Sequence, residues 1–133
     1  MTFVARHISI GISCPPARAA NFAGNPKNLP RWAAGLSSGI RLENERWITD
    51  SPMGAVEVRF VGPVDHGILD HDVIFPDGTR VHNPLRVLVN GDGSEVVFTL
   101  YRLPGVSDAD FEKDASLVRE DLERLRKVLE SGH

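Results

Sequence analysis

Histidine and aspartate lie close together in one part of the sequence, in Asp65-His66-Gly67 and Asp70-His71-Asp72. Side chains of these types bind divalent metals and exchange protons near neutral pH. Residues 68–75 alternate as a β-strand does, so His71 and the aspartates on either side of it should point to opposite faces of a sheet. They then cannot share one ion, and no metal site is predicted.

Asp70 and Asp72 are instead expected on a solvated strand face, where arginines of neighbouring strands pair with them. The candidate partners are Arg59 and either Arg80 or Arg86. His71 is left on the inner face, where its neighbours are the apolar side chains of Leu69, Val73 and Phe75.

Two inward polar side chains are therefore the candidates for chemistry. His71 is either a core histidine with satisfied hydrogen bonds or an acid–base group in a cavity, because imidazole can give and take a proton near neutral pH. Asn83 could hold a ligand carbonyl through its amide, or it could cap a bulge in its strand. The sequence leaves both pairs of alternatives open.

Nucleophilic and nucleotide chemistry have little support. Cys14, the single cysteine, continues the core face of its strand, where a buried thiol is usually inert. The sequence has no G-x-S-x-G motif. Gly91 and Gly93 belong to a hairpin rather than to a phosphate loop before a helix. No cofactor is predicted.

Seven strands are expected to position these residues. The first, residues 3–12, has isoleucine at alternate positions, and Pro15-Pro16 ends it. The others are expected at residues 40–43, 46–49, 55–61, 68–75, 79–90 and 94–102. Asn44-Glu45 and Asn90-Gly91-Asp92-Gly93 are hairpin signals between strands. Pro84 predicts a bulge or an unpaired edge inside the long strand 79–90.

Two short helices should follow the first strand. One runs from Pro16 to about Ala23, and a second covers residues 26–34 with Asn25 as its cap. Pro30 lies inside the second, so two irregular turns are an alternative there.

A long helix is predicted over residues 108–130, with Ser107 as its N-cap and Gly132 beyond its end. Its apolar positions step by four and three: Phe111, Ala115, Val118, Leu122, Leu125 and Leu129. Such a seam could form a dimeric coiled coil. An antiparallel sheet with one apolar face needs a cover, however, so we expect the helix to pack on the chain's own sheet.

The composition is that of a soluble protein of one domain. The 133 residues are 41% hydrophobic and 25% charged. Fifteen Lys and Arg against eighteen Asp and Glu leave no basic excess to bind nucleic acid. The longest uncharged stretch, residues 8–17, is ten residues with two prolines, so no membrane span is predicted. A cytoplasmic location is expected, because the N-terminus lacks the apolar region of a signal peptide.

The order of these elements resembles the START-related superfamily, also called birch-pollen-allergen-like, which includes polyketide cyclases and lipid-transfer proteins. Residues 7–16 (HISIGISCPP) are similar to its opening strand running into a proline-started helix. Residues 25–32 (NPKNLPRW) resemble its D/N-P-x-N-x-P-x-W turn before the second strand. The resemblance implies an α+β helix-grip fold over residues 1–133, in which a curved antiparallel sheet of about seven strands packs on the C-terminal helix.

The resemblance also implies a cavity for an apolar or aromatic molecule between sheet and helix. Strand and helix periodicity give most of the expected lining: Val58, Phe60, His71, Val73, Asn83, Leu85, Phe98, Val118 and Leu122. The resemblance adds Trp32, which follows the short helices where the mouth of the family's cavity lies. Trp32 is large enough that plain core packing would explain it equally well.

Three functions are compatible with this arrangement. The leading expectation is a module that binds one small hydrophobic or aromatic molecule. The first alternative is a polyketide cyclase/dehydratase-like enzyme, in which His71 exchanges a proton and Asn83 polarises a carbonyl. The second is a protein-interaction module with a vestigial cavity, for which an exposed apolar patch that uses Trp32 would be the sign.

Overall fold

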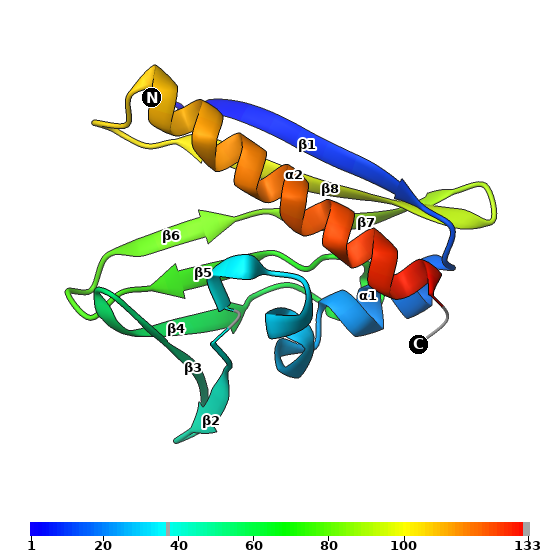
Figure 1. Ribbon diagram of the computed structural model, residues 1–133, viewed down its shortest axis with the longest axis horizontal. Coiled ribbons are helices and arrows are strands. Elements are labelled where there is room, and N and C mark those ends of the chain that lie inside the picture. The colour runs from blue at the N-terminus through cyan, green and yellow to red at the C-terminus, as the bar shows by residue number, and fades with distance from the viewer. Residues whose placement is uncertain (37, 132–133) are drawn as a thin grey trace.

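Eight antiparallel strands and a long C-terminal helix, α2 (Asp108–Glu130), make up most of the computed structural model, which describes residues 1–36 and 38–131 (Figure 1). The strands are β1 (Val4–Ile12), β2 (Arg41–Glu43), β3 (Arg46–Ser51), β4 (Gly54–Phe60), β5 (His71–Ile74), β6 (Arg80–Asn83), β7 (Leu85–Asn90) and β8 (Gly93–Arg102). The α+β helix-grip architecture expected from the sequence is confirmed. Over the same residues, no helix has the length and apolar character needed to cross a membrane.

The expected count of seven strands is wrong by one, because Pro84 divides the long strand 79–90 into β6 and β7. The two halves pair with different neighbours. β7 belongs to a sheet of order β1-β8-β7, and β6 ends a sheet of order β2-β3-β4-β5-β6. Since proline has no N–H to give to a ladder, the hydrogen-bonding pattern changes at this residue. The expected single curved sheet is therefore two sheets that meet at Pro84.

Hydrogen bonds from three directions hold this junction together. The Pro84 carbonyl accepts from Thr99 N at 3.0 Å, and the Leu85 carbonyl accepts from Leu69 N at 2.8 Å. The Leu85 N–H donates to Asp70 Oδ1 at 2.9 Å. A carboxylate thus takes the place of a strand partner where the ladder stops. β5 begins directly after Asp70, later than the predicted start at residue 68.

The hairpin turns match the sequence signals. Asn44 and Glu45 both have left-handed backbone conformations, with φ of 51° and 65°, as a two-residue type I′ turn requires. Asn90 pairs with Gly93 across the other turn, and Gly91 has a φ of 59°. These turns fix the register of β2 with β3 and of β7 with β8.

Four short helical segments lie between strands in the described residues. α1 (Pro16–Ala23) begins at a proline, as predicted, and it buries three alanines. The second expected helix is instead two 3₁₀ segments, η1 (Pro26–Arg31) and η2 (Ala34–Leu36). Asn25 caps η1, accepting from Lys27 N at 3.1 Å. Another 3₁₀ turn, η3 (Val64–His66), lies between β4 and β5.

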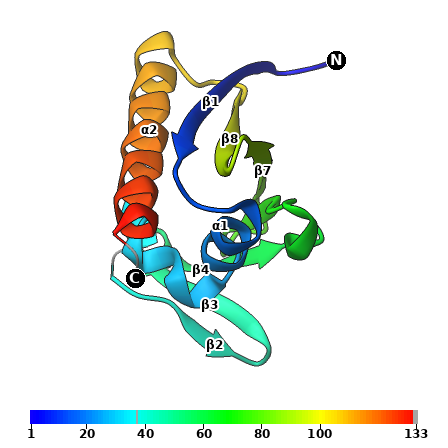
Figure 2. The same ribbon diagram turned by 90° about the vertical axis from the view of Figure 1, so that its right-hand side faces the viewer.

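Helix α2 packs on one face of β1 and β8, and Figure 2 shows it alongside that sheet. The Ser107 hydroxyl caps it by accepting from Asp110 N at 3.1 Å. Its buried residues are Phe111, Ala115, Leu122, Leu125 and Leu129, and the opposing core residues include Ile8, Ile10 and Val96. The seam stepping by four and three therefore covers the chain's own sheet, as expected. Gly132, expected beyond the helix end, lies outside the described residues.

Candidate functional site

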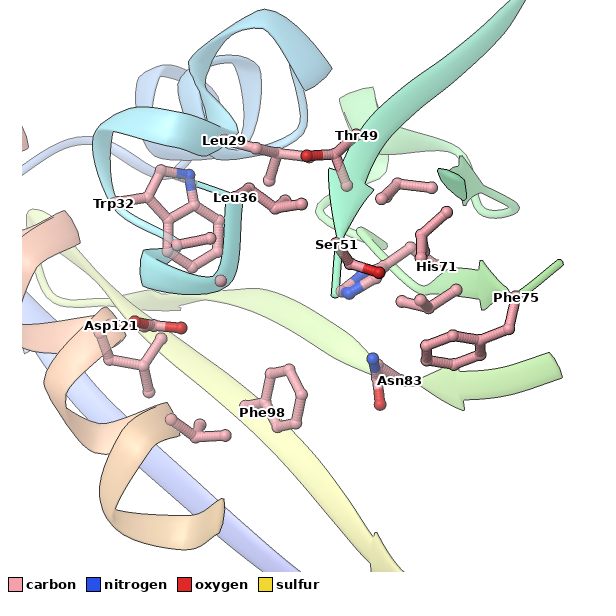
Figure 3. Close-up of a pocket in the computed structure, with 17 residues that line it drawn as sticks. Leu29, Trp32, Leu36, Thr49, Ser51, His71, Phe75, Asn83, Phe98 and Asp121 are labelled. Atoms are coloured by element: carbon pink, nitrogen blue, oxygen red, sulfur yellow. The ribbon is translucent and has the colours of Figure 1, made fainter. Parts of the chain in front are cut away.

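A cavity of about 340 Å³ lies between α2, the η1–η2 segment and the inner face of the sheets (Figure 3). Strands β3, β4, β5, β6 and β8 form one wall, and α2 with residues 29–36 forms the other. Most of the lining is apolar. The polar side chains among the described lining residues are Trp32, Thr49, Ser51, His71, Asn83 and Asp121.

The cavity brings together eight of the ten residues expected to line it: Trp32, Val58, His71, Val73, Asn83, Phe98, Val118 and Leu122. Phe60 and Leu85 lie outside the lining. The Phe60 ring packs against the His71 ring with centroids 5.4 Å apart, and Leu85 is fully buried in the core next to Pro84. Whether the eight contact a ligand stays a prediction.

His71 and Asn83 are direct cross-strand partners on β5 and β6, which places both side chains in the same wall. His71 Nδ1 lies 3.0 Å from the Leu69 carbonyl oxygen. A carbonyl can only accept, so Nδ1 carries the proton and Nε2 is left as an acceptor. Burial lowers the pKa of His71, and the bond to Leu69 only partly offsets this, so the ring is neutral near pH 7.

Trp32 and Asp121 lie at the other side of the cavity. The Trp32 side chain is only 4% exposed, and its carbonyl accepts from Arg124 Nη1 at 2.9 Å. Asp121 Oδ1 accepts from Ala34 N at 3.1 Å and from Arg124 Nη1 at 2.9 Å. These bonds fasten the η1–η2 segment to α2. Burial raises the pKa of Asp121 despite the two donors.

The two hydroxyl groups of β3 already use their protons within the protein. Thr49 Oγ1 donates to the Gly39 carbonyl at 2.7 Å, and Ser51 Oγ donates to the Gly54 carbonyl at 2.8 Å. Both oxygens can therefore only accept from a ligand. No lysine or arginine is among the described residues that line the cavity.

The outer side of β5 differs from expectation in its burial. Asp70 and Asp72 point away from the cavity as predicted, but they are 8% and 7% exposed rather than solvated. Asp70 makes two 2.9 Å bonds to Arg86, and Asp72 binds Arg80 at 3.1 Å and His82 at 2.6 Å. These partly exposed side chains reach over the carboxylates and shield them from water.

The electrostatics of this outer side follow from those bonds. The bonds from Arg86 lower the pKa of Asp70. For Asp72, burial acts to raise the pKa, but the bonds from His82 and Arg80 outweigh it and the pKa is lowered. Arg59, the other candidate partner, pairs instead with Glu57 at 3.0 Å. Over residues 1–36 and 38–131, no three His, Cys, Asp or Glu side chains come together as a metal site.

Several lining residues were not anticipated. Asp121 is three positions after Val118 on α2, so helical spacing alone could have placed it on the cavity side. Thr49 and Ser51 alternate with Trp47 along β3, so the period of two of a strand could have placed their side chains on one face of the sheet. Leu29 and Leu36 lie in 3₁₀ segments, for which neither a period of two nor one of 3.6 gives a signal.

Solved structures share this architecture over almost the whole chain. The solution structure of the Aha1 dimer from Colwellia psychrerythraea has a TM-score of 0.72 at 14% identity, covering 95% of this chain and 96% of that one. A START superfamily protein from Mycobacterium smegmatis has a TM-score of 0.67 at 9% identity, covering 97% and 99%. The chain has the helix-grip fold of the START superfamily. The resemblance drawn from the sequence is thereby confirmed at the level of the fold.

The same helix-grip fold occurs in Ara h 8.0201, with a TM-score of 0.67 at 11% identity over 96% of this chain and 98% of that one. Identities this low establish the fold and not the activity. No protein-family model matches the sequence, and no curated protein matches it significantly. The function must therefore be argued from the cavity itself.

Proposed function

We propose that residues 1–133 form one helix-grip domain that binds a small hydrophobic or aromatic molecule between the sheets and α2. The observation that carries the proposal is the mainly apolar cavity of about 340 Å³. Its volume lies at the small end of the range of roughly 300–1,000 Å³ typical of small-molecule sites. An apolar ligand of one or two rings would bury most of its surface there, and this burial is the main source of binding free energy.

The polar groups of the cavity suit an apolar ligand with few polar atoms. Thr49 and Ser51 hydroxyls are bonded to backbone carbonyls, and His71 is neutral near pH 7. Little of the wall therefore has to be desolvated when a ligand enters, since these groups keep their partners.

Uptake of the uncharged fluorophore N-phenyl-1-naphthylamine tests the proposal. Binding should raise its emission with one-to-one stoichiometry. Val118→Trp adds an indole to a cavity-lining position of α2 and should weaken uptake at least about tenfold by filling the space. Leu117→Trp adds the same indole at the next position, which is 46% exposed, and should leave uptake unchanged. Equal uptake by both variants would mean that the dye binds elsewhere.

A second candidate function is a cyclase/dehydratase-like enzyme, favoured by the pairing of His71 with Asn83 in one cavity wall. His71 Nε2 would take a proton from the substrate, while the Asn83 amide would polarise a carbonyl. The Leu69 carbonyl orients the imidazole. A screen with short polyketone thioesters tests this, since turnover should be lost in His71→Ala and kept in His82→Ala. Turnover that survives His71→Ala would exclude the mechanism.

The protein-interaction alternative has less support, because Trp32 is 4% exposed and offers no surface to a partner. A protein partner and a cytoplasmic location stay predictions. Native mass spectrometry of the protein purified from its host would separate a bound metabolite from a bound protein, and cell fractionation would give the compartment.

A further inference from the structure

The indole N–H of Trp32 has no hydrogen-bond acceptor among the described residues, although the side chain is 96% buried. Buried donors in native proteins are almost always paired, and an unpaired one is costly. Figure 3 shows the indole nitrogen turned toward Leu29 and Leu36, which line the same cavity and have no polar side-chain atom. The nitrogen itself has almost no accessible surface, because these leucine side chains cover it. An acceptor oxygen of a ligand or of water therefore reaches this donor when Leu29 or Leu36 turns aside.

Nearby polar groups do not accept the hydrogen bond of the Trp32 N–H. Asp121 is the acidic side chain in the described lining, and its Oδ1 accepts from Ala34 N and Arg124. Arg124 in turn bonds the Trp32 carbonyl and Asp121, so both groups are committed to holding the η1–η2 segment. The Trp32 N–H is thus the one side-chain donor in the described lining that is both sealed from solvent and unused.

The charge of the lining restricts the ligand further. No described lining residue is lysine or arginine, and Asp121 contributes a carboxyl group. A ligand carboxylate or phosphate would be desolvated without a counter-ion, which costs far more than binding an uncharged oxygen. His71, on the opposite side of the cavity in Figure 3, offers Nε2 as an acceptor for a ligand hydroxyl.

We propose that the ligand is an uncharged ring compound with a carbonyl or comparable oxygen that accepts a hydrogen bond from Trp32 Nε1. The inference rests on the proposed binding function and adds the chemical class of the ligand and the residue that selects it. A hydrogen bond from an N–H to a carbonyl adds only modestly to the net binding free energy. The role of Trp32 should therefore be measured as the preference for a ketone over a ligand of the same shape that lacks the oxygen, rather than as a loss of total affinity.

Two ligands of equal shape isolate this bond. 2-Acetylnaphthalene carries a carbonyl oxygen where 2-isopropenylnaphthalene carries a CH₂ group, and both can displace N-phenyl-1-naphthylamine. We take the ratio of their dissociation constants as the preference. In Trp32→Phe, which keeps an aromatic ring but has no N–H, the preference for the ketone should fall about threefold to tenfold. The isopropenyl compound should bind within about threefold of wild type, because it makes no such bond.

Trp47→Phe is the matched control. Trp47, on β3, is the only other tryptophan in the sequence and is outside the cavity lining, so its loss should leave the preference unchanged. 2-Naphthoate, the anionic analogue of the ketone, should bind at least about tenfold more weakly at neutral pH. Naphthoate binding as tight as that of the ketone would overturn the uncharged class.

A spectroscopic measurement keeps the test valid if Trp32→Phe folds poorly. In Trp47→Phe, Trp32 is the only indole, and ultraviolet resonance Raman scattering reports the hydrogen bonding of its N–H. The band should move to its hydrogen-bonded position with 2-acetylnaphthalene and not with 2-isopropenylnaphthalene. Equal spectra, or an equal preference in wild type and Trp32→Phe, would overturn the inference. Failure of every neutral ring compound to bind would instead overturn the binding function.

Discussion

The carboxylate of Asp70 at the junction of the two sheets gives the sharpest test of how the fold is held together. It is 8% exposed, accepts from Leu85 N at 2.9 Å and makes two bonds of 2.9 Å to Arg86. Asp70→Ala removes all three and leaves the Leu85 N–H without an acceptor. Asp70→Asn keeps an oxygen for that N–H but removes the charge.

The expected losses follow from these contacts. An unmet buried N–H costs about 1–3 kcal/mol, and an ion pair to a half-exposed arginine adds about 1 kcal/mol, because Arg86 is 48% exposed. Asp70→Ala should therefore lower the free energy of unfolding by about 2–4 kcal/mol, and Asp70→Asn by about 1 kcal/mol. For 133 residues, at about 2.1 cal/mol/K per residue, these losses lower Tm by roughly 7–14 °C and 3–4 °C.

Thermal unfolding by circular dichroism, with urea titration, measures both variants. Asp50→Ala is the control, since it also removes a carboxylate paired with an arginine, but one that is 75% exposed. Its effect should stay within about 0.5 kcal/mol. If Asp70→Ala were no more damaging than Asp50→Ala, the assigned role of Asp70 at the junction would be wrong.

The same carboxylate predicts a pH dependence. The bonds from Arg86 lower the pKa of Asp70 in the folded protein. Its stabilisation is therefore complete above the unfolded pKa of about 3.9 and is lost as the pH falls through the folded pKa. The stability gap between wild type and Asp70→Asn should be constant from pH 6 to 7 and should close below about pH 4. A gap that widens in acid would contradict the assignment.

Three further predictions concern single residues. Because burial lowers the pKa of His71, its NMR titration in the folded protein should have a midpoint below the unfolded value of about 6.5. Wild type should lose stability relative to His71→Gln as the pH falls from about 6.5 to the folded midpoint, because only the unfolded state is protonated readily in that range. A midpoint above 6.5 would contradict the burial of His71. Thr49→Val should cost about 1–2 kcal/mol in urea unfolding, since the Gly39 carbonyl loses its 2.7 Å donor; an unchanged midpoint would show that water replaces it. Glu45→Gly should raise stability by about 0.5–1 kcal/mol because φ is 65° there, while Glu45→Ala should not; equal effects would point away from backbone strain.

The sequence predicted most of the fold because its signals were local. Ser107 marks the start of α2, the alternating isoleucines mark β1, and Asn44-Glu45 marks a turn, and each of these rests on neighbours in the chain. Pro84 also gave its signal, but a missing N–H says only that pairing is disturbed. That β6 and β7 join different sheets depends on long-range pairing with β5 and β8.

The alternation of side chains along the strands predicted part of the candidate site. His71 and Asn83 were placed on the inner face by a period of two, and the structure adds that they are direct partners. Alternation along the strand would place Val89 on the same face as Leu85, but Val89 is 78% exposed, because the end of β7 extends past the core toward its hairpin. The burial of Asp70 was missed because a charged residue on an outer face usually signals solvent, and here Arg86 covers it.

The central claim is that the space between the sheets and α2 holds a ligand, and intermolecular NOEs test it most directly. With methyl-labelled protein and 2-acetylnaphthalene, the account predicts NOEs from the ring protons to methyl groups of Val58, Val73, Val118 and Leu122, which line the cavity. NOEs confined to exposed methyl groups, such as those of Val89 and Leu117, would place the compound on the surface and contradict the claim.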